Sequence, residues 1–128
     1  MFNAQTIQMQ GTTATDVYSP WFPRGGDYGQ LTLEVAVIGG AGTPTLAVAL
    51  FHKNASETGD GALATTLAFS RTSAGRTSVD FYNGAGASPT FGGFKELVRY
   101  KFTISGGSAG ITSWATFRML APVWYDKV

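Results

Sequence analysis

Short runs in which apolar and polar residues alternate are the feature that most limits the folds open to this chain. In the run at 30–38 every second residue is apolar. The set that shares one face is Leu31, Leu33, Val35 and Val37. Successive side chains of a β-strand point to opposite faces, so a period of two predicts a strand with one buried face. The period recurs at 43–53, 96–105 and 112–120, and no window keeps helical spacing over three turns. We therefore predict an all-β protein.

Four further runs of this kind bring the expected number of strands to about eight. They lie at 2–9, 12–18, 62–69 and 77–82, and glycine-rich segments separate them. A chain of 128 residues is expected to form one domain, 1–128. We predict that this domain is an antiparallel β-sandwich with a jelly-roll-like topology, because an open sheet with this number of strands would expose long unpaired edges. The GGAGTP segment has the composition of a turn, and we expect the runs on either side of it to form two antiparallel strands.

The segment SPWFPRGGDYGQ at 19–30 interrupts the alternation. Pro20 and Pro23 have a fixed φ and no N–H to donate, which predicts a corner between strands or at a sheet edge. We expect Gly25 and Gly26 to adopt the positive φ that turns the chain into the next strand. The C-terminal segment LAPVWYDKV has a similar proline and aromatic content, and we expect both segments to cover the same end of the sandwich.

Charged residues make up only 13% of the chain, and the formal net charge is +1. In most globular proteins about a quarter of the residues are charged. A net charge near zero also favours association between proteins. The surface is therefore either covered by neighbouring subunits or built from the small polar turns of a β-rich domain. The densest basic cluster is Lys95, Arg99 and Lys101, which is typical of a cross-strand charge ladder. Nucleic-acid binders usually have a domain-wide basic excess, so we predict no nucleic-acid partner, with contact between Arg99 and a single strand as the alternative.

The chain has no cysteine, which excludes disulfides and thiolate sites. Residues 1–10 lack the basic region and apolar run of a secretory signal, so we predict no signal peptide. The longest mostly apolar stretch, at 31–42, is too short and too polar to span a bilayer. These features predict no membrane partner and a location in the cytoplasm or in a virion.

Motifs for catalysis and metal binding are weak. His52 is the one histidine, and Ser108 lies in a GGSAG segment that fits G-x-S-x-G. A nucleophile elbow needs a helix after the serine, whereas the residues that follow Ser108 have the period of a strand. Residues 54–61 carry several oxygen-bearing side chains but lack the order of a calcium loop. We predict no enzymatic activity, no cofactor and no metal site.

Aromatic residues in or beside loops are the remaining candidates for function. They could stack on sugars, anchor a protein interface or pack inward. The candidate interface anchors are Trp21, Phe22, Tyr28, Phe91, Phe94, Trp124 and Tyr125. With the low charge, they predict a self-associating structural subunit, such as a coat or decoration protein of a phage or virus-like particle, whose partners are its own copies or other particle subunits. The alternative is a carbohydrate-binding module that uses surface aromatics to hold a glycan.

Overall fold

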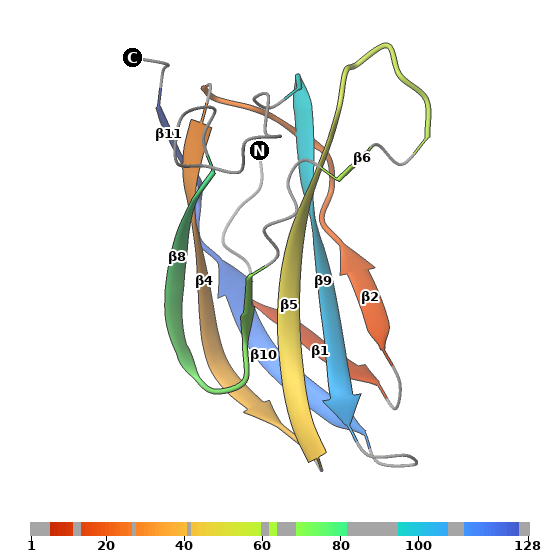
Figure 1. Ribbon diagram of the computed structural model, residues 1–128, viewed down its shortest axis with the longest axis vertical. Coiled ribbons are helices and arrows are strands. Elements are labelled where there is room, and N and C mark those ends of the chain that lie inside the picture. The colour runs from red at the N-terminus through yellow and green to blue at the C-terminus, as the bar shows by residue number, and fades with distance from the viewer. Residues whose placement is uncertain are drawn as a thin grey trace.

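The computed structural model describes residues 6–11, 14–26, 28–40, 42–59, 62–63, 69–81, 95–107 and 112–125. In this part of the chain the regular structure consists of strands packed in two layers (Figure 1). The strands are β1 (Ile7–Gly11), β2 (Thr15–Tyr18), β3 (Phe22–Pro23), β4 (Tyr28–Gly39), β5 (Gly42–Lys53), β6 (Ala62–Leu63), β7 (Phe69–Arg71), β8 (Gly75–Phe81), β9 (Leu97–Gly107), β10 (Ser113–Met119) and β11 (Val123–Tyr125). The all-β prediction is confirmed.

One layer, the β4 sheet, is centred on β4, and all its pairings are antiparallel. Gly29 and Gln30 pair with β8 and with β11 at once, so these two strands lie on opposite edges of β4. β10 pairs with residues 33–39 of β4, on the same edge as β11. β11 therefore continues β10 along that edge, and β1 completes the sheet beyond β10.

The other layer, the β9 sheet, has the same plan. β5 pairs with β9 along most of its length, and its other edge carries β7 at residues 46–48 and β6 at residues 51–52. The second edge of β9 carries β2 and then β3. Each of these outer edges is thus one strand with an interruption.

Among the described residues, counting β2 with β3, β6 with β7 and β10 with β11 as interrupted strands gives eight strands, four in each sheet. Their order across the β4 sheet is then first, eighth, third and sixth. Across the β9 sheet it is second, seventh, fourth and fifth. Two antiparallel four-stranded sheets connected in this way form a jelly roll. The predicted sandwich and its jelly-roll topology are confirmed.

The core lies between the sheets and contains the side chains that the alternation predicted. Its buried members on the three longest strands are Leu31, Leu33, Val35, Leu46, Val48, Leu50, Val98, Tyr100, Phe102 and Ile104. Phe102 on β9 and Phe117 on β10 bring the two sheets together, with ring centres 4.9 Å apart. Aromatic pairs at this distance add to the free energy gained from burial.

Val37 departs from the predicted pattern, because its side chain is 50% exposed instead of buried. The register between β10 and β4 shifts at this point: Thr116 pairs with Val37, but Phe117 pairs with Val35. Ala36 is therefore an extra residue in β4. Such a β-bulge reverses the alternation that follows it, and it sends Val37 to the outside of the sheet.

The strands on either side of GGAGTP do not pair with each other. β4 belongs to one sheet and β5 to the other, so this turn carries the chain between the layers. Gly40 and Gly42 have φ values of 130° and 86°, a region that favours glycine. Composition identified the turn, but it could not distinguish a hairpin from a crossing between sheets.

Candidate functional site

The segment at 19–26 and the strand β11 meet at one end of the sandwich, as the sequence predicted. A Cβ atom added at Gly25 would lie 2.4 Å from Cδ1 of Trp124, and one added at Gly26 would lie 2.5 Å from the carbonyl oxygen of Tyr125. Neither glycine has a positive φ, so the expected reason for their presence is wrong. Glycine is needed here because the C-terminal strand lies directly against the corner.

The predicted anchors divide into different environments at this end. Phe22 is only 5% exposed and its ring centre lies 5.4 Å from that of Tyr100, so Phe22 is a core residue that a neighbour cannot reach. Trp124 is half-buried and packs on the core, whereas Tyr125 is exposed. The backbone of Tyr28 pairs with Tyr125. The side chain of Tyr28, and Phe91 and Phe94, lie outside what the structure describes.

An apolar pocket of about 280 Å³ lies between the corner and β11. Phe22, Pro23, Ala121, Pro122 and Trp124 form most of its lining. Phe22 and Trp124 are at this position because their side chains pack inward and contact the core. The corner therefore has a structural role, which is to close one end of the sandwich.

Exposed apolar side chains concentrate instead on the outer face of the β4 sheet, which we call the β4 outer face. Among the described residues, the large exposed hydrophobic side chains are Val17, Tyr18, Val37, Trp114, Val123 and Tyr125. The last four belong to the β4 outer face. Trp114 pairs with Gly39 in the register and Thr116 pairs with Val37, so Val37 and Trp114 are diagonal neighbours on one face.

Val123 and Tyr125 form a second apolar pair at the other end of the β4 outer face. They alternate along β11 with Trp124, which faces the core. Their cross-strand partners are Gln30 and Tyr28, at the beginning of β4. The β4 outer face thus has one apolar pair at each end. Of these four side chains, only Tyr125 was among the predicted interface anchors.

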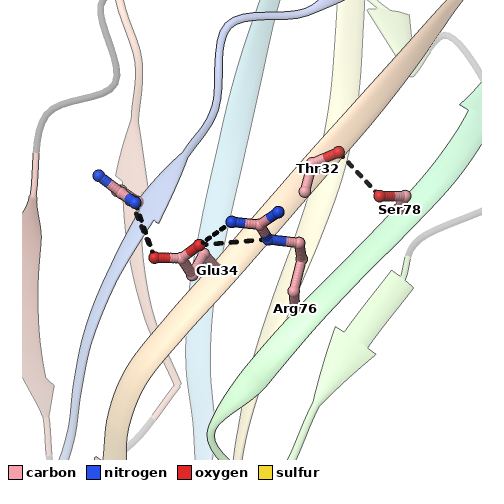
Figure 2. A network of polar contacts seen from close by, with 5 residues as sticks. Thr32, Glu34, Arg76 and Ser78 are labelled. Carbon is pink, nitrogen blue, oxygen red and sulfur yellow. Dashed lines mark hydrogen bonds and ion pairs between the residues drawn. The ribbon is translucent and has the colours of Figure 1, made fainter.

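A polar cluster separates the two apolar pairs. Glu34 lies between two guanidinium groups (Figure 2): Nη2 of Arg76 is 2.6 Å from one carboxylate oxygen, and Nη2 of Arg118 is 2.9 Å from the other. The hydrogen bond from Arg76, with help from Arg118, holds the pKa of Glu34 below its usual value. The hydroxyl groups of Thr32 and Ser78 lie 2.8 Å apart beside this cluster (Figure 2).

A shallow groove of about 390 Å³ runs beside Trp114. Gln8, Gln10 and Thr116 contribute polar side chains to it. Added at Gly39, a Cβ atom would lie 2.8 Å from Cζ2 of Trp114, so the glycine makes room for the indole ring to lie against β4. The groove combines an exposed aromatic ring with amide and hydroxyl groups.

The outer face of the β9 sheet, which we call the β9 outer face, carries aromatic rings and cations together. The Cζ atom of Arg99 lies 4.3 Å from the ring centre of Tyr18 and 4.6 Å from that of Trp21. Lys53 lies 4.7 Å from the ring centre of Trp21, and Lys101 lies 6.0 Å from that of Tyr18. Arg99 and Lys101 were expected in a charge ladder and Trp21 was a predicted interface anchor. The structure places the half-buried Trp21 against Lys53 and Arg99, and Tyr18, which was not predicted, against Arg99 and Lys101.

His52 has a structural environment. Its Nδ1 atom accepts a hydrogen bond of 3.2 Å from the backbone N–H of Lys95, which precedes β9. Burial and the nearby Lys95 ammonium group lower the pKa of His52 below its usual value of 6.5. Lys95 itself forms an ion pair of 3.1 Å with Glu57. In the part of the chain that the structure describes, no group of three His, Asp or Glu side chains could hold a metal ion. Ser108 lies outside this part.

Protonation of His52 is expected to destabilise the fold. Its pKa is lower in the folded than in the unfolded state, so the neutral form stabilises the fold fully above about pH 6.5, and this contribution is lost as the pH falls through the lowered pKa. The free energy of unfolding, measured by urea titration between about pH 7 and pH 5, should therefore decrease. His52→Asn keeps an acceptor for Lys95 without titrating and should flatten this slope. An equal slope in both proteins would contradict the assignment to His52.

The sequence matches no family of known proteins, and no curated protein and no solved structure is significantly similar to it. The described residues contain no helix long and apolar enough to cross a membrane. The function is therefore inferred from the surfaces described above.

Proposed function

We propose that this protein is a non-enzymatic structural subunit that self-associates through the β4 outer face. One observation carries the proposal: four of the six large hydrophobic side chains exposed among the described residues lie on that face. Single exposed hydrophobic residues are normal on any protein, but pairs gathered on one face are typical of an interface. Here they form one pair at each end of the sheet.

The mechanism is geometric. Val37 and Trp114 at one end, and Val123 and Tyr125 at the other, provide apolar area for a neighbouring subunit to bury. Tryptophan and tyrosine are also the residue types that contribute most to many interfaces. The cluster around Glu34 lies between the pairs, and the charge of Glu34 is already balanced by the two arginines. These ion pairs lower the desolvation free energy that a neighbouring subunit would have to overcome when it covers the cluster.

The setting that best fits these features is a phage or virus-like particle, with the protein as coat or decoration subunit. Jelly rolls are common among capsid proteins, although the fold also serves lectins and other functions, so this step is an analogy. The low content of charge supports it independently. With a net charge of +1, many copies can pack together without accumulating repulsion.

Three valines make a matched test of the interface. Val37→Asp and Val123→Asp each place a charge on the β4 outer face, whereas Val17→Asp places it on β2 in the other sheet. Because an unpaired charge is costly at an apolar interface, we expect each of the first two to weaken self-association by about tenfold or more. Light scattering coupled to size-exclusion chromatography, over a series of concentrations, measures the effect.

Val17→Asp should leave the assembly unchanged. A wild-type protein that stays monomeric at all concentrations would overturn the proposal, and so would an equal loss of assembly in all three variants. Circular dichroism of each variant separates loss of assembly from loss of folding.

The groove beside Trp114 favours a second candidate function, the binding of a neutral glycan. An aromatic ring flanked by amide and hydroxyl groups can stack on a sugar and bond its hydroxyls, and about 390 Å³ lies within the range of ligand sites. This candidate requires a monomer that is retained by immobilised neutral glycans and loses retention in Trp114→Ala. Because Val123→Asp lies at the other end of the face, it should not affect glycan retention, which distinguishes the two functions.

A further inference from the structure

The strand β8 forms a long edge of the β4 sheet (Figure 1). It has seven residues and pairs with β4 without a shift in register, whereas the other edge strands, β1, β2, β3, β6 and β7, have five residues or fewer. Among the described residues, no strand pairs with the second edge of β8. It also contains neither proline nor lysine, which commonly protect an exposed edge. A regular edge of this length is a template for pairing with another strand.

The hydrogen bonds of β4 show which of its residues bond to β8. The backbone N–H of Leu120, just after β10, donates a hydrogen bond of 2.9 Å to the carbonyl oxygen of Thr32. The backbone of Thr32 therefore faces the edge of β4 that carries β10 and β11. The N–H and C=O groups of successive strand residues point to opposite edges, so those of Leu31 and Leu33 face β8.

The same alternation shows which backbone groups of β8 point outward. Val79 and Thr77 are opposite Leu31 and Leu33 and bond to β4. The residues between and beside them direct their N–H and C=O groups away from β4; they are Arg76, Ser78 and Asp80. A side chain confirms this direction at one of them, because Nη1 of Arg71, on β7, donates a hydrogen bond of 3.3 Å to the carbonyl oxygen of residue 76.

The outward-facing residues of β8 are complementary to themselves. Charged residues on an edge usually oppose pairing, but Arg76 and Asp80 have opposite signs and stand two residues to either side of Ser78. If two β8 strands pair antiparallel with Ser78 opposite Ser78, all three outward-facing residues form hydrogen-bonded pairs, and Asp80 of each copy is opposite Arg76 of the other. Opposite charges at such positions stabilise strand pairing, and a two-fold axis is the commonest symmetry of protein dimers.

Arg76 can make this contact while it binds Glu34. Its hydrogen bonds to Glu34 come from Nε and Nη2, and its side chain is 60% exposed. A guanidinium group has five N–H donors, so a second carboxylate can bind through Nη1.

We propose that two copies of this protein pair through β8, antiparallel and with the two-fold axis at Ser78, which joins their β4 sheets into one continuous sheet. Both β4 outer faces then lie on the same side of the joined sheet. The pairing uses the edge of the sheet and not its face, so it does not depend on the self-association proposed above.

A single engineered cysteine tests this pairing, because the chain has none of its own. In the proposed dimer the Cα atoms of the two Ser78 residues are about 5.5 Å apart, within the range of disulfides. Ser78→Cys should therefore form a disulfide-linked dimer under a mild oxidant, measured by non-reducing electrophoresis.

Thr32→Cys is the matched control, because the hydroxyl groups of Thr32 and Ser78 are 2.8 Å apart but Thr32 lies one strand further from the edge. Across the dimer, the two copies of residue 32 are separated by about 10 Å more than the two copies of residue 78, which is too far for a disulfide. The rates are divided by the reaction rate of each thiol with a small alkylating reagent. After this correction, Ser78→Cys should crosslink at least about tenfold faster than Thr32→Cys.

Reversal of charge tests the register. Asp80→Lys places a cation opposite Arg76, and the two-fold axis repeats this contact, so we expect the dimer to weaken by about tenfold. Adding Arg76→Glu restores opposite charges and should recover most of the lost affinity. Light scattering coupled to size-exclusion chromatography measures dimerisation, and circular dichroism checks that the double variant, which also loses the bond to Glu34, is folded.

Equal corrected rates of crosslinking at positions 32 and 78 would overturn the proposal and would indicate contact through the β4 outer face. Absence of a disulfide dimer in Ser78→Cys would also overturn it, as would a loss of affinity in Asp80→Lys that the folded double variant does not reverse. Fast crosslinking of Ser78→Cys that persists when Val37→Asp is added would support edge pairing even if self-association through the β4 outer face fails.

Discussion

Replacing Phe102 with alanine is expected to lower the free energy of unfolding by about 3–5 kcal/mol. Phe102 is fully buried on β9, and its ring contacts Phe117 of the opposite sheet and Tyr100 of its own strand, with ring centres 4.9 and 5.8 Å apart. The truncation removes apolar area and leaves a cavity at the junction of the two sheets. Because a domain is stable by only about 5–15 kcal/mol, this variant should be close to unfolding.

Urea titration at constant pH measures the effect, and Phe51→Ala provides the matched control. Phe51 projects from the outside of β5, where its side chain is half-exposed. The same substitution there leaves no closed cavity, so the loss should be about 1 kcal/mol. Equal losses at the two positions would mean that the inside and outside of the β9 sheet have been assigned wrongly.

The inside of the sandwich was predictable because the chemistry of a strand repeats every two residues. The alternation placed Tyr100 and Phe102 with the apolar residues of β9, and both are buried. It failed at Val37, where one inserted residue reverses the phase. A bulge depends on the partner strand, and nothing in the run from 30 to 38 marks it.

The pairing of the strands was harder to predict from the sequence than their positions. Every long strand was expected close to where it lies, yet β4 and β5 belong to different sheets although they are joined by a short turn. Turn composition shows that the chain changes direction. It does not show whether the next strand pairs with the last one or joins the other sheet, because this choice depends on pairing with strands that are distant in the sequence.

The candidate surfaces were predictable only in part, since exposure of an aromatic ring depends on its three-dimensional neighbours. Trp124 and Tyr125 are adjacent in sequence, yet one packs on the core and the other is exposed. Trp114 did have a usable signal: it alternates with Ala115 and so shares a phase with Thr116 and Arg118, the polar side of β10. Trp21 was a predicted anchor because it lies in the corner segment, but nothing in the sequence links its ring, or that of Tyr18, to the cations at 53, 99 and 101, which come from other strands.

The substitution Gly26→Ala, in the corner that begins at Ser19, is expected to have the second large effect on stability. The new Cβ atom would lie 2.5 Å from the carbonyl oxygen and 3.0 Å from the backbone nitrogen of Tyr125. Backbone atoms of a paired strand cannot rotate away, so β11 must shift from the corner. We expect the free energy of unfolding to fall by about 1–3 kcal/mol, as is typical of overpacking.

The displacement of β11 gives this prediction a second readout that simple destabilisation would not. Trp124 packs on the core between Gly25 and Gly29, and moving its strand should expose the indole ring and shift its fluorescence to longer wavelength in the folded protein. Gly59→Ala is the control: Gly59 has a positive φ of 93° but no atom within 4 Å of the added Cβ, so it reports only the backbone penalty, about 1–2 kcal/mol. Unchanged fluorescence in Gly26→Ala, with stability equal to wild type, would show that β11 does not lie against the corner.

Because Val123 and Tyr125 lie on the same strand, a shifted β11 should also weaken self-association, which links the closure of this end to the proposed interface.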